Sequence, residues 1–76
     1  MKEQILKLCG EVLPHIDFTA SNKLVDDGIL DSISIITLVS ELSMEFGVEF
    51  DLDSLEPKNL NSIDAIVETV QELQAK

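Results

Sequence analysis

The residues best suited to chemistry are Asp31 and Ser32, a carboxylate followed directly by a hydroxyl. Both are good N-cap residues, and an amphipathic helical pattern begins at this point, so Ser32 could simply cap a helix. The other interpretation is chemical. A helix N-terminus offers unpaired backbone N–H groups and a positive dipole end, which suit a phosphate ester on the Ser32 hydroxyl.

A serine that acts as a nucleophile by itself needs a general base and a group that orients this base. The chain has one histidine, His15, and nothing in the sequence places it near Ser32. We therefore predict no catalytic residue of the serine hydrolase type. The segment that begins at Asp51 and includes Asp53 lacks the glycine at the sixth position and the glutamate at the twelfth that a calcium-binding loop needs. No metal site is therefore expected.

Three stretches have apolar residues at three- and four-residue spacing, which is typical of amphipathic helices. They are residues 3–13, residues 32–46 and the stretch from Asn61 to Leu73. Pro14 should end the first helix, and Gly47 can supply the left-handed conformation that ends the second. The last helix is expected to start at Asn61, with Asp64 three residues on as in a capping box.

The connections between these stretches differ in length. Residues 15–31 form a long polar connection, and we expect its interspersed apolar residues to pin it onto the core. Further on, Asp51 or Asp53 could cap a brief helical turn that Pro57 then limits. No segment alternates strongly enough to predict a strand. The pattern predicts an all-α fold with three main helices, one short helix and a long first loop, in a single domain over residues 1–76.

The charge balance narrows the choice of partner. Fifteen Asp and Glu against five Lys give a formal net charge of −10. Such a chain repels nucleic acid and anionic membrane surfaces, whereas a protein with a basic patch would be attracted. No apolar run approaches the roughly 20 residues of a membrane span, and the first residues do not resemble a signal peptide. One cysteine, Cys9, allows no internal disulfide, so we expect the reducing cytoplasm as the setting. We also expect a monomer.

The second helical stretch carries apolar residues outside its core face. At about 100° per residue, Ile33 and Met44 lie opposite the core face and Ile36 lies at its edge. Glu41 and Glu45 flank this stripe. Apolar residues rimmed by acids are typical of an interaction surface for partner proteins. The alternative is that Ile33 and Ile36 pack under the short helix or the long loop.

Three segments together resemble an acyl carrier protein: Leu24-Val25-Asp26-Asp27-Gly28-Ile29-Leu30-Asp31-Ser32-Ile33, Leu38-Val39 with Glu41-Leu42, and Glu45-Phe46-Gly47-Val48. Acyl carrier proteins are small acidic four-helix bundles with a long first loop, and the resemblance covers nearly the whole chain. It implies that a phosphopantetheinyl transferase attaches 4′-phosphopantetheine from coenzyme A covalently to Ser32. It also implies that Asp31 helps the transferase to dock, and that the second helix docks partner enzymes.

The resemblance implies a carrier and not an enzyme. The thiol of the attached arm would hold an acyl or aminoacyl group as a thioester, received from a loading enzyme and delivered to downstream enzymes. The form Gly28-Ile29-Leu30-Asp31-Ser32 looks closest to D-alanyl and stand-alone aminoacyl carrier proteins, so an aminoacyl cargo is favoured over a fatty or polyketide acyl chain. An alternative from another class is an unmodified acidic interaction domain of the same fold, in which Ser32 only caps the helix.

Overall fold

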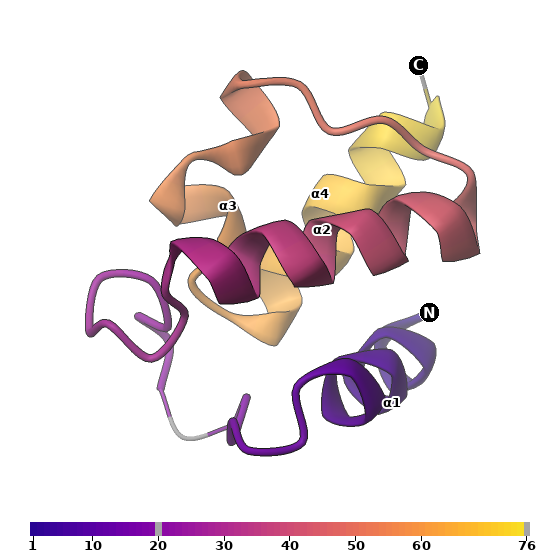
Figure 1. Ribbon diagram of the computed structural model, residues 1–76. Helices are drawn as coiled ribbons and strands as arrows, with labels where there is room; N and C mark the ends of the chain where they lie inside the picture. Colours follow the sequence, from indigo (N-terminus) through magenta and orange to yellow (C-terminus); the bar gives the residue numbers. More distant parts are fainter. Residues whose placement is uncertain (20, 76) are drawn as a thin grey trace.

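The computed structural model describes residues 1–19 and 21–75 and shows a bundle of helices (Figure 1). The elements are α1 (Lys2–Val12), α2 (Ser32–Phe46), the 3₁₀ helix η1 (Asp53–Leu55), α3 (Pro57–Leu60) and α4 (Ile63–Ala75). Figure 1 shows α1 and α3 on opposite sides of α2, with α4 behind α2 and in contact with all three other α-helices. The part of the chain described here contains no strand, and the predicted all-α bundle is confirmed.

The core is formed by one face of each long helix together with apolar residues of the long connection. Its buried members are Ile5, Cys9, Leu13, Phe18, Leu24, Leu30, Leu38, Leu42, Leu60, Ile63, Ile66 and Val70. Phe18, Leu24 and Leu30 belong to the connection between α1 and α2, which is therefore pinned onto the core as expected. Burial also raises the pKa of the Cys9 thiol to about 12, so this thiol stays protonated and unreactive.

The ends of α1 and α2 follow the local sequence signals. Leu13 is the C-cap residue of α1, directly before Pro14, because a proline disfavours the helical conformation in the residue that precedes it. Gly47 is the C-cap residue of α2 and has φ 64° and ψ 37°. This is the left-handed region, which glycine enters without the steric cost that a Cβ atom brings.

The start of α4 differs from the sequence expectation. The pattern places it at Asn61, but α4 begins at Ile63 and Ser62 is its N-cap residue. The Ser62 hydroxyl accepts a hydrogen bond from the Ala65 N–H at 3.0 Å, and the Ser62 carbonyl accepts from the Ile66 N–H at 3.0 Å. The capping-box arrangement of Asn61 and Asp64 does not form, because the Asn61 side chain is hydrogen-bonded to the long connection instead.

The connection between α2 and α4 holds two short helices instead of one. The N-cap residue of η1 is Leu52, and neither Asp51 nor Asp53 takes this position. The Asp51 carboxylate, one residue earlier, accepts a hydrogen bond from the Ser54 N–H at 2.9 Å. Pro57 follows η1, but it is also the first residue of α3. A proline is well tolerated at this position, because the first N–H groups of a helix have no partner within the helix. The expectation that Pro57 only limits a helix is therefore incomplete.

Few of the acidic side chains are neutralised by lysine. Within the described residues two salt bridges are formed, Lys2 with Asp64 at 2.8 Å and Lys58 with Glu56 at 3.3 Å, and both are exposed to solvent. Exposed pairs of this kind contribute little to stability. Most of the net charge of −10 therefore acts as repulsion between acids, which destabilises the folded state.

We expect the melting temperature to rise with ionic strength, because added ions screen this repulsion. Between about 0.01 M and 0.5 M sodium chloride the gain should be about 1 kcal/mol, or roughly 4–8 °C for a domain of this size. Thermal unfolding followed by circular dichroism measures it. Chloride is used because sulfate stabilises proteins by exclusion from their surface. A melting temperature that does not change with salt would show that the acids do not repel one another appreciably.

Candidate functional site

Ser32 is the first residue of α2, and Asp31 is the residue that caps this helix. Asp31 has an extended backbone with φ −88° and ψ 179°, and its carboxylate accepts a hydrogen bond from the Ser34 N–H at 2.8 Å. Its carbonyl accepts from the Ile35 N–H at 2.9 Å. The interpretation that Ser32 serves only as the cap is therefore wrong, and capping does not account for a serine at this position.

The Ser32 side chain is open to solvent, and its hydroxyl forms no hydrogen bond to the described part of the chain. It lies at the N-terminal end of a 15-residue helix. The positive end of the helix dipole stabilises a phosphate group placed there. The chemistry that this position suits is thus formation of a phosphoester on an exposed hydroxyl.

The carboxylate of Asp31 is held in its ionised form. Hydrogen bonds from the backbone N–H and then from the hydroxyl of Ser34 lower its pKa, and an electrostatic interaction with His15 lowers it further. His15 therefore lies within electrostatic range of Asp31, which the sequence does not reveal.

We expect Asp31→Ala to lower the melting temperature at neutral pH, because α2 loses its N-cap. The pKa of Asp31 is lowered in the folded protein, so its stabilising contribution is present above the ordinary value of 3.8. This contribution is lost as the pH falls through the lowered pKa of the folded state. The difference in melting temperature between the wild type and Asp31→Ala should therefore shrink below about pH 4.

Asp31→Asn is the matched control for this experiment. Asparagine retains an oxygen that can accept from the Ser34 N–H, but it carries no charge. At neutral pH the melting temperature of Asp31→Asn should therefore lie closer to that of the wild type than to that of Asp31→Ala. A difference between the wild type and Asp31→Ala that stays constant down to the lowest pH measured would contradict the ionised cap.

The outward face of α2 is apolar and exposed. The exposed fractions are 77% for Ile33, 66% for Ile36 and 73% for Met44. The alternative that Ile33 and Ile36 pack under the short helix or the long loop is therefore wrong. Side chains of this size gain from being covered, so their exposure is typical of a surface that binds another protein.

The two acids expected beside this face lie on one side of it. Glu41 is half-buried, and Glu45 is exposed. Glu45 lines an open hollow of about 270 Å³ between α2 and α1, together with the α1 residues Gln4, Lys7, Leu8 and Glu11. Because Glu41 and Glu45 are four residues apart on one helix, both lie toward α1. The Ile36 side of the apolar face has no acidic rim from α2.

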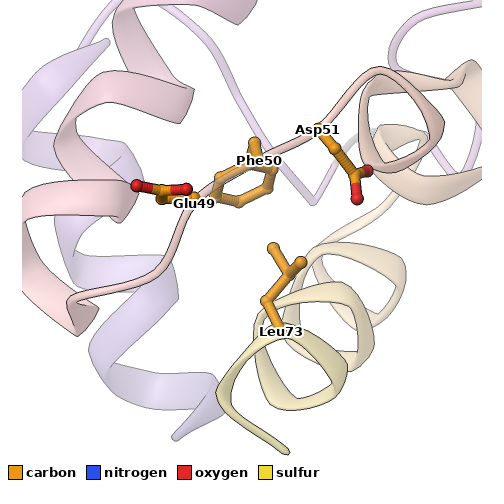
Figure 2. Close-up of a pocket in the computed structure, with 4 residues that line it drawn as sticks. All are labelled: Glu49, Phe50, Asp51 and Leu73. Carbon is orange, nitrogen blue, oxygen red and sulfur yellow. The ribbon is translucent and has the colours of Figure 1, made fainter. Parts of the chain in front are cut away.

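Another hollow, of about 300 Å³, is lined by Glu49, Phe50, Asp51 and Leu73 (Figure 2). Figure 2 shows Phe50 and Leu73 as its apolar lining, with the carboxylates of Glu49 and Asp51 to either side. It lies beyond the C-terminal end of α2, whereas Ser32 is at the N-terminal end. A helix of 15 residues is about 22 Å long, so this hollow is separate from the Ser32 site.

Residues 1–19 and 21–75 contain no cluster of three or more His, Cys, Asp or Glu side chains that could hold a metal ion. No helix within these residues is long and apolar enough to cross a membrane.

The comparisons with known proteins decide the family. A family model described as "Phosphopantetheine attachment site" matches residues 3–70, which include α2, α3, nearly all of α1 and most of α4. The chain belongs to this family. Domains of the phosphopantetheine attachment family carry a 4′-phosphopantetheine group bound covalently to a serine. Neither a curated protein nor a solved structure matches the chain.

Membership confirms the broad expectation of a carrier. Phosphopantetheine attachment domains are in general carriers and substrates of other enzymes, and they work with a phosphopantetheinyl transferase and acyl-handling enzymes. The position of Ser32 fits such a group, because an exposed hydroxyl at a helix N-terminus accommodates a phosphodiester without displacing any protein contact.

The sequence patterns did not predict the contacts of two residues near this site. His15 approaches Asp31 through the fold, and Asn61 binds the connection that leads to Ser32. The Asn61 contacts join residues 35 and 36 positions apart. No local pattern signals a contact over that separation, and Asn61 by itself is compatible with a helix start.

Proposed function

We propose that the chain is one carrier domain over residues 1–76 and that Ser32 is the serine that holds the 4′-phosphopantetheine group. The observation that carries this proposal is the state of the Ser32 hydroxyl, which is exposed, lies at a helix N-terminus and makes no hydrogen bond to the described chain. The other serines lack one or more of these properties.

Most of the other serines have structural roles. Ser34 and Ser54 are buried, and Ser62 caps α4. Ser21 donates to Asp27 and Ser43 donates to the Val48 carbonyl. Ser40 is exposed, but it lies within α2, away from the positive end of the helix dipole. Attachment at Ser32 would leave all of these contacts in place.

The residues around Ser32 have separate parts in this function. The Ser32 hydroxyl gives up its proton, and its oxygen forms a phosphoester bond with the phosphorus of the phosphopantetheine group of coenzyme A. The diphosphate bond of coenzyme A breaks in this step, and adenosine 3′,5′-bisphosphate is the leaving group. Asp31, ionised and exposed, is the residue that the transferase recognises. Once bound, the group supplies a terminal thiol that holds the cargo as a thioester. The chain acts as a substrate of its partner enzymes and has no catalytic residue of its own.

The cargo that we favour is an activated amino acid, with D-alanine among the candidates. Support comes from the form of the motif, Gly28-Ile29-Leu30-Asp31-Ser32, which is similar to that of D-alanyl and stand-alone aminoacyl carrier proteins. The first turns of α2 also contain no acidic residue, unlike the glutamate-dense helix of fatty-acid carriers. A fatty or polyketide acyl chain is the alternative. Loading of the modified protein by an adenylating enzyme, compared between amino acids and fatty acids, separates them.

The outward face of α2 is the surface that we propose for partner enzymes. Ile33, Ile36 and Met44 supply its apolar contacts, and Glu41 and Glu45 form its acidic margin toward α1. An enzyme that acts on an arm attached to Ser32 has to approach this end of the helix. A cytoplasmic setting and a monomeric state are consistent with one buried cysteine and a high net charge.

Incubation of the unmodified protein with coenzyme A and a broad-specificity phosphopantetheinyl transferase tests the proposal. The intact mass should rise by one phosphopantetheine unit. If several active transferases produce no rise, the chain is instead an unmodified acidic interaction domain of the same fold.

A further inference from the structure

Asn61 joins the junction of α3 and α4 to the connection that leads to Ser32. Its side-chain oxygen accepts hydrogen bonds from the N–H groups of Val25 at 2.9 Å and Asp26 at 3.1 Å. Its side-chain nitrogen donates to the Asp26 carboxylate at 3.1 Å, and its backbone carbonyl accepts from the Leu24 N–H at 2.8 Å. One residue thus makes four hydrogen bonds to three consecutive residues of the connection.

Asn61 is well placed to hold this connection. It is the C-cap residue of α3, and the next residue caps α4, so helices on both sides fix its backbone. The two backbone N–H donors also determine which atom of the amide faces the connection, because only the oxygen can accept them. The side chain of Asn61 is half-buried, which shields these hydrogen bonds partly from water.

The contact reaches Ser32 through Leu24 and Leu30. Leu24 is fully buried, and its carbonyl accepts a hydrogen bond from the Leu30 N–H at 2.9 Å. Leu30 is 2% exposed and directly precedes Asp31, the cap of α2. The path from Asn61 to the start of α2 therefore consists of hydrogen bonds and buried side chains throughout.

We propose that Asn61 is a positioning residue for the modification of Ser32, an inference that rests on the function proposed above. Asn61 holds residues 24–26 against the junction of α3 and α4, and thereby keeps the approach to Ser32 in the one arrangement that a transferase can bind. Without this contact the connection samples other arrangements, and only a fraction of the molecules is competent to bind.

The first test is Asn61→Ala. The apparent affinity for a binding partner falls in proportion to the competent fraction, so the KM of the transferase for the carrier should rise about tenfold while kcat stays unchanged. Amide hydrogen exchange at Val25 and Asp26 should become faster, because these N–H groups lose their acceptor. The KM effect is measured below the melting temperature of both proteins, so that global unfolding does not contribute.

Exchange of the two side chains provides a sharper test. Asn61→Asp alone places a second carboxylate against that of Asp26 and removes the side-chain donor. The two carboxylates repel each other, so KM should rise at least as much as for Asn61→Ala. When Asp26→Asn is added to Asn61→Asp, the amide of residue 26 can donate to the carboxylate of residue 61. The net charge of the double variant equals that of the wild type. This double variant should return KM and the exchange rates to within about threefold of the wild type.

Asn59→Ala is the matched control. The Asn59 side chain also donates to a backbone carbonyl, that of Asp53 at 2.8 Å, but it holds η1 and not the connection before Ser32. It should leave KM unchanged even where it lowers the melting temperature.

Two results would overturn the role of Asn61: a KM for Asn61→Ala equal to that of the wild type, or unchanged amide exchange at Val25 and Asp26. A double variant that stays as poor as Asn61→Asp would also count against it. Failure of the proposed function looks different, since the wild type itself would then gain no mass with any transferase. Hydrogen exchange would still report whether Asn61 holds the connection.

Discussion

Ser32→Ala is expected to abolish the gain of one phosphopantetheine unit that the wild type shows with coenzyme A and a transferase. Alanine at the first position of α2 has no hydroxyl group, so no phosphoester can form there. The loss should be complete, because no nearby group can replace the hydroxyl as the nucleophile. Intact-mass measurement after a long incubation gives the result directly.

The fold should be unaffected by this change. Asp31 and not Ser32 caps α2, and Ser32 is exposed, so the melting temperature of Ser32→Ala should lie close to that of the wild type. Ser40→Ala is the matched control, since Ser40 is an exposed serine of the same helix, and it should be modified at the wild-type rate. A mass gain that persists in Ser32→Ala and disappears in Ser40→Ala would move the attachment site to Ser40.

Ile36→Glu is expected to slow loading of the modified carrier by its cognate enzyme about thirtyfold in kcat/KM, or about 2 kcal/mol. Ile36 is 66% exposed, and it lies one helical turn beyond Ser32 on the apolar face of α2. If this side chain fills a pocket of the enzyme, glutamate both removes the apolar contact and places a charge in an uncharged environment. The fold should tolerate the change, because the side chain is not part of the core.

Gln71→Glu is the control for the added charge. Gln71 is exposed on α4, and the substitution changes the net charge by the same amount. It should alter loading by less than about twofold, since distant rim charges act mainly on the association rate. Met44→Glu then measures how far the contact extends, because Met44 lies about 18 Å along α2 from Ser32. Normal loading of Ile36→Glu together with slow loading of Gln71→Glu would show that the docking surface lies on α4.

The local sequence determined the helices and the position of the candidate serine within them. Apolar spacing is set by the 3.6-residue period, so α1 and α2 lie where this pattern predicts. Their ends depend on residues that act on their own backbone: Pro14 on Leu13, Asp31 on Ser34, and Gly47 through its positive φ. These are interactions over a few residues, and a sequence displays them directly.

The tertiary structure decided what depends on distant residues. Exposure of Ile33 and Ile36 could not be inferred from the helix period, because it depends on where α3 and the long connection pack. The start of α4 at Ile63 has the same origin. The side-chain oxygen of Asn61 accepts hydrogen bonds from residues 25 and 26, so it does not cap a helix. The approach of His15 to Asp31 likewise requires the folded connection. In each case the partner lies far along the chain, and only packing of the core brings the two together.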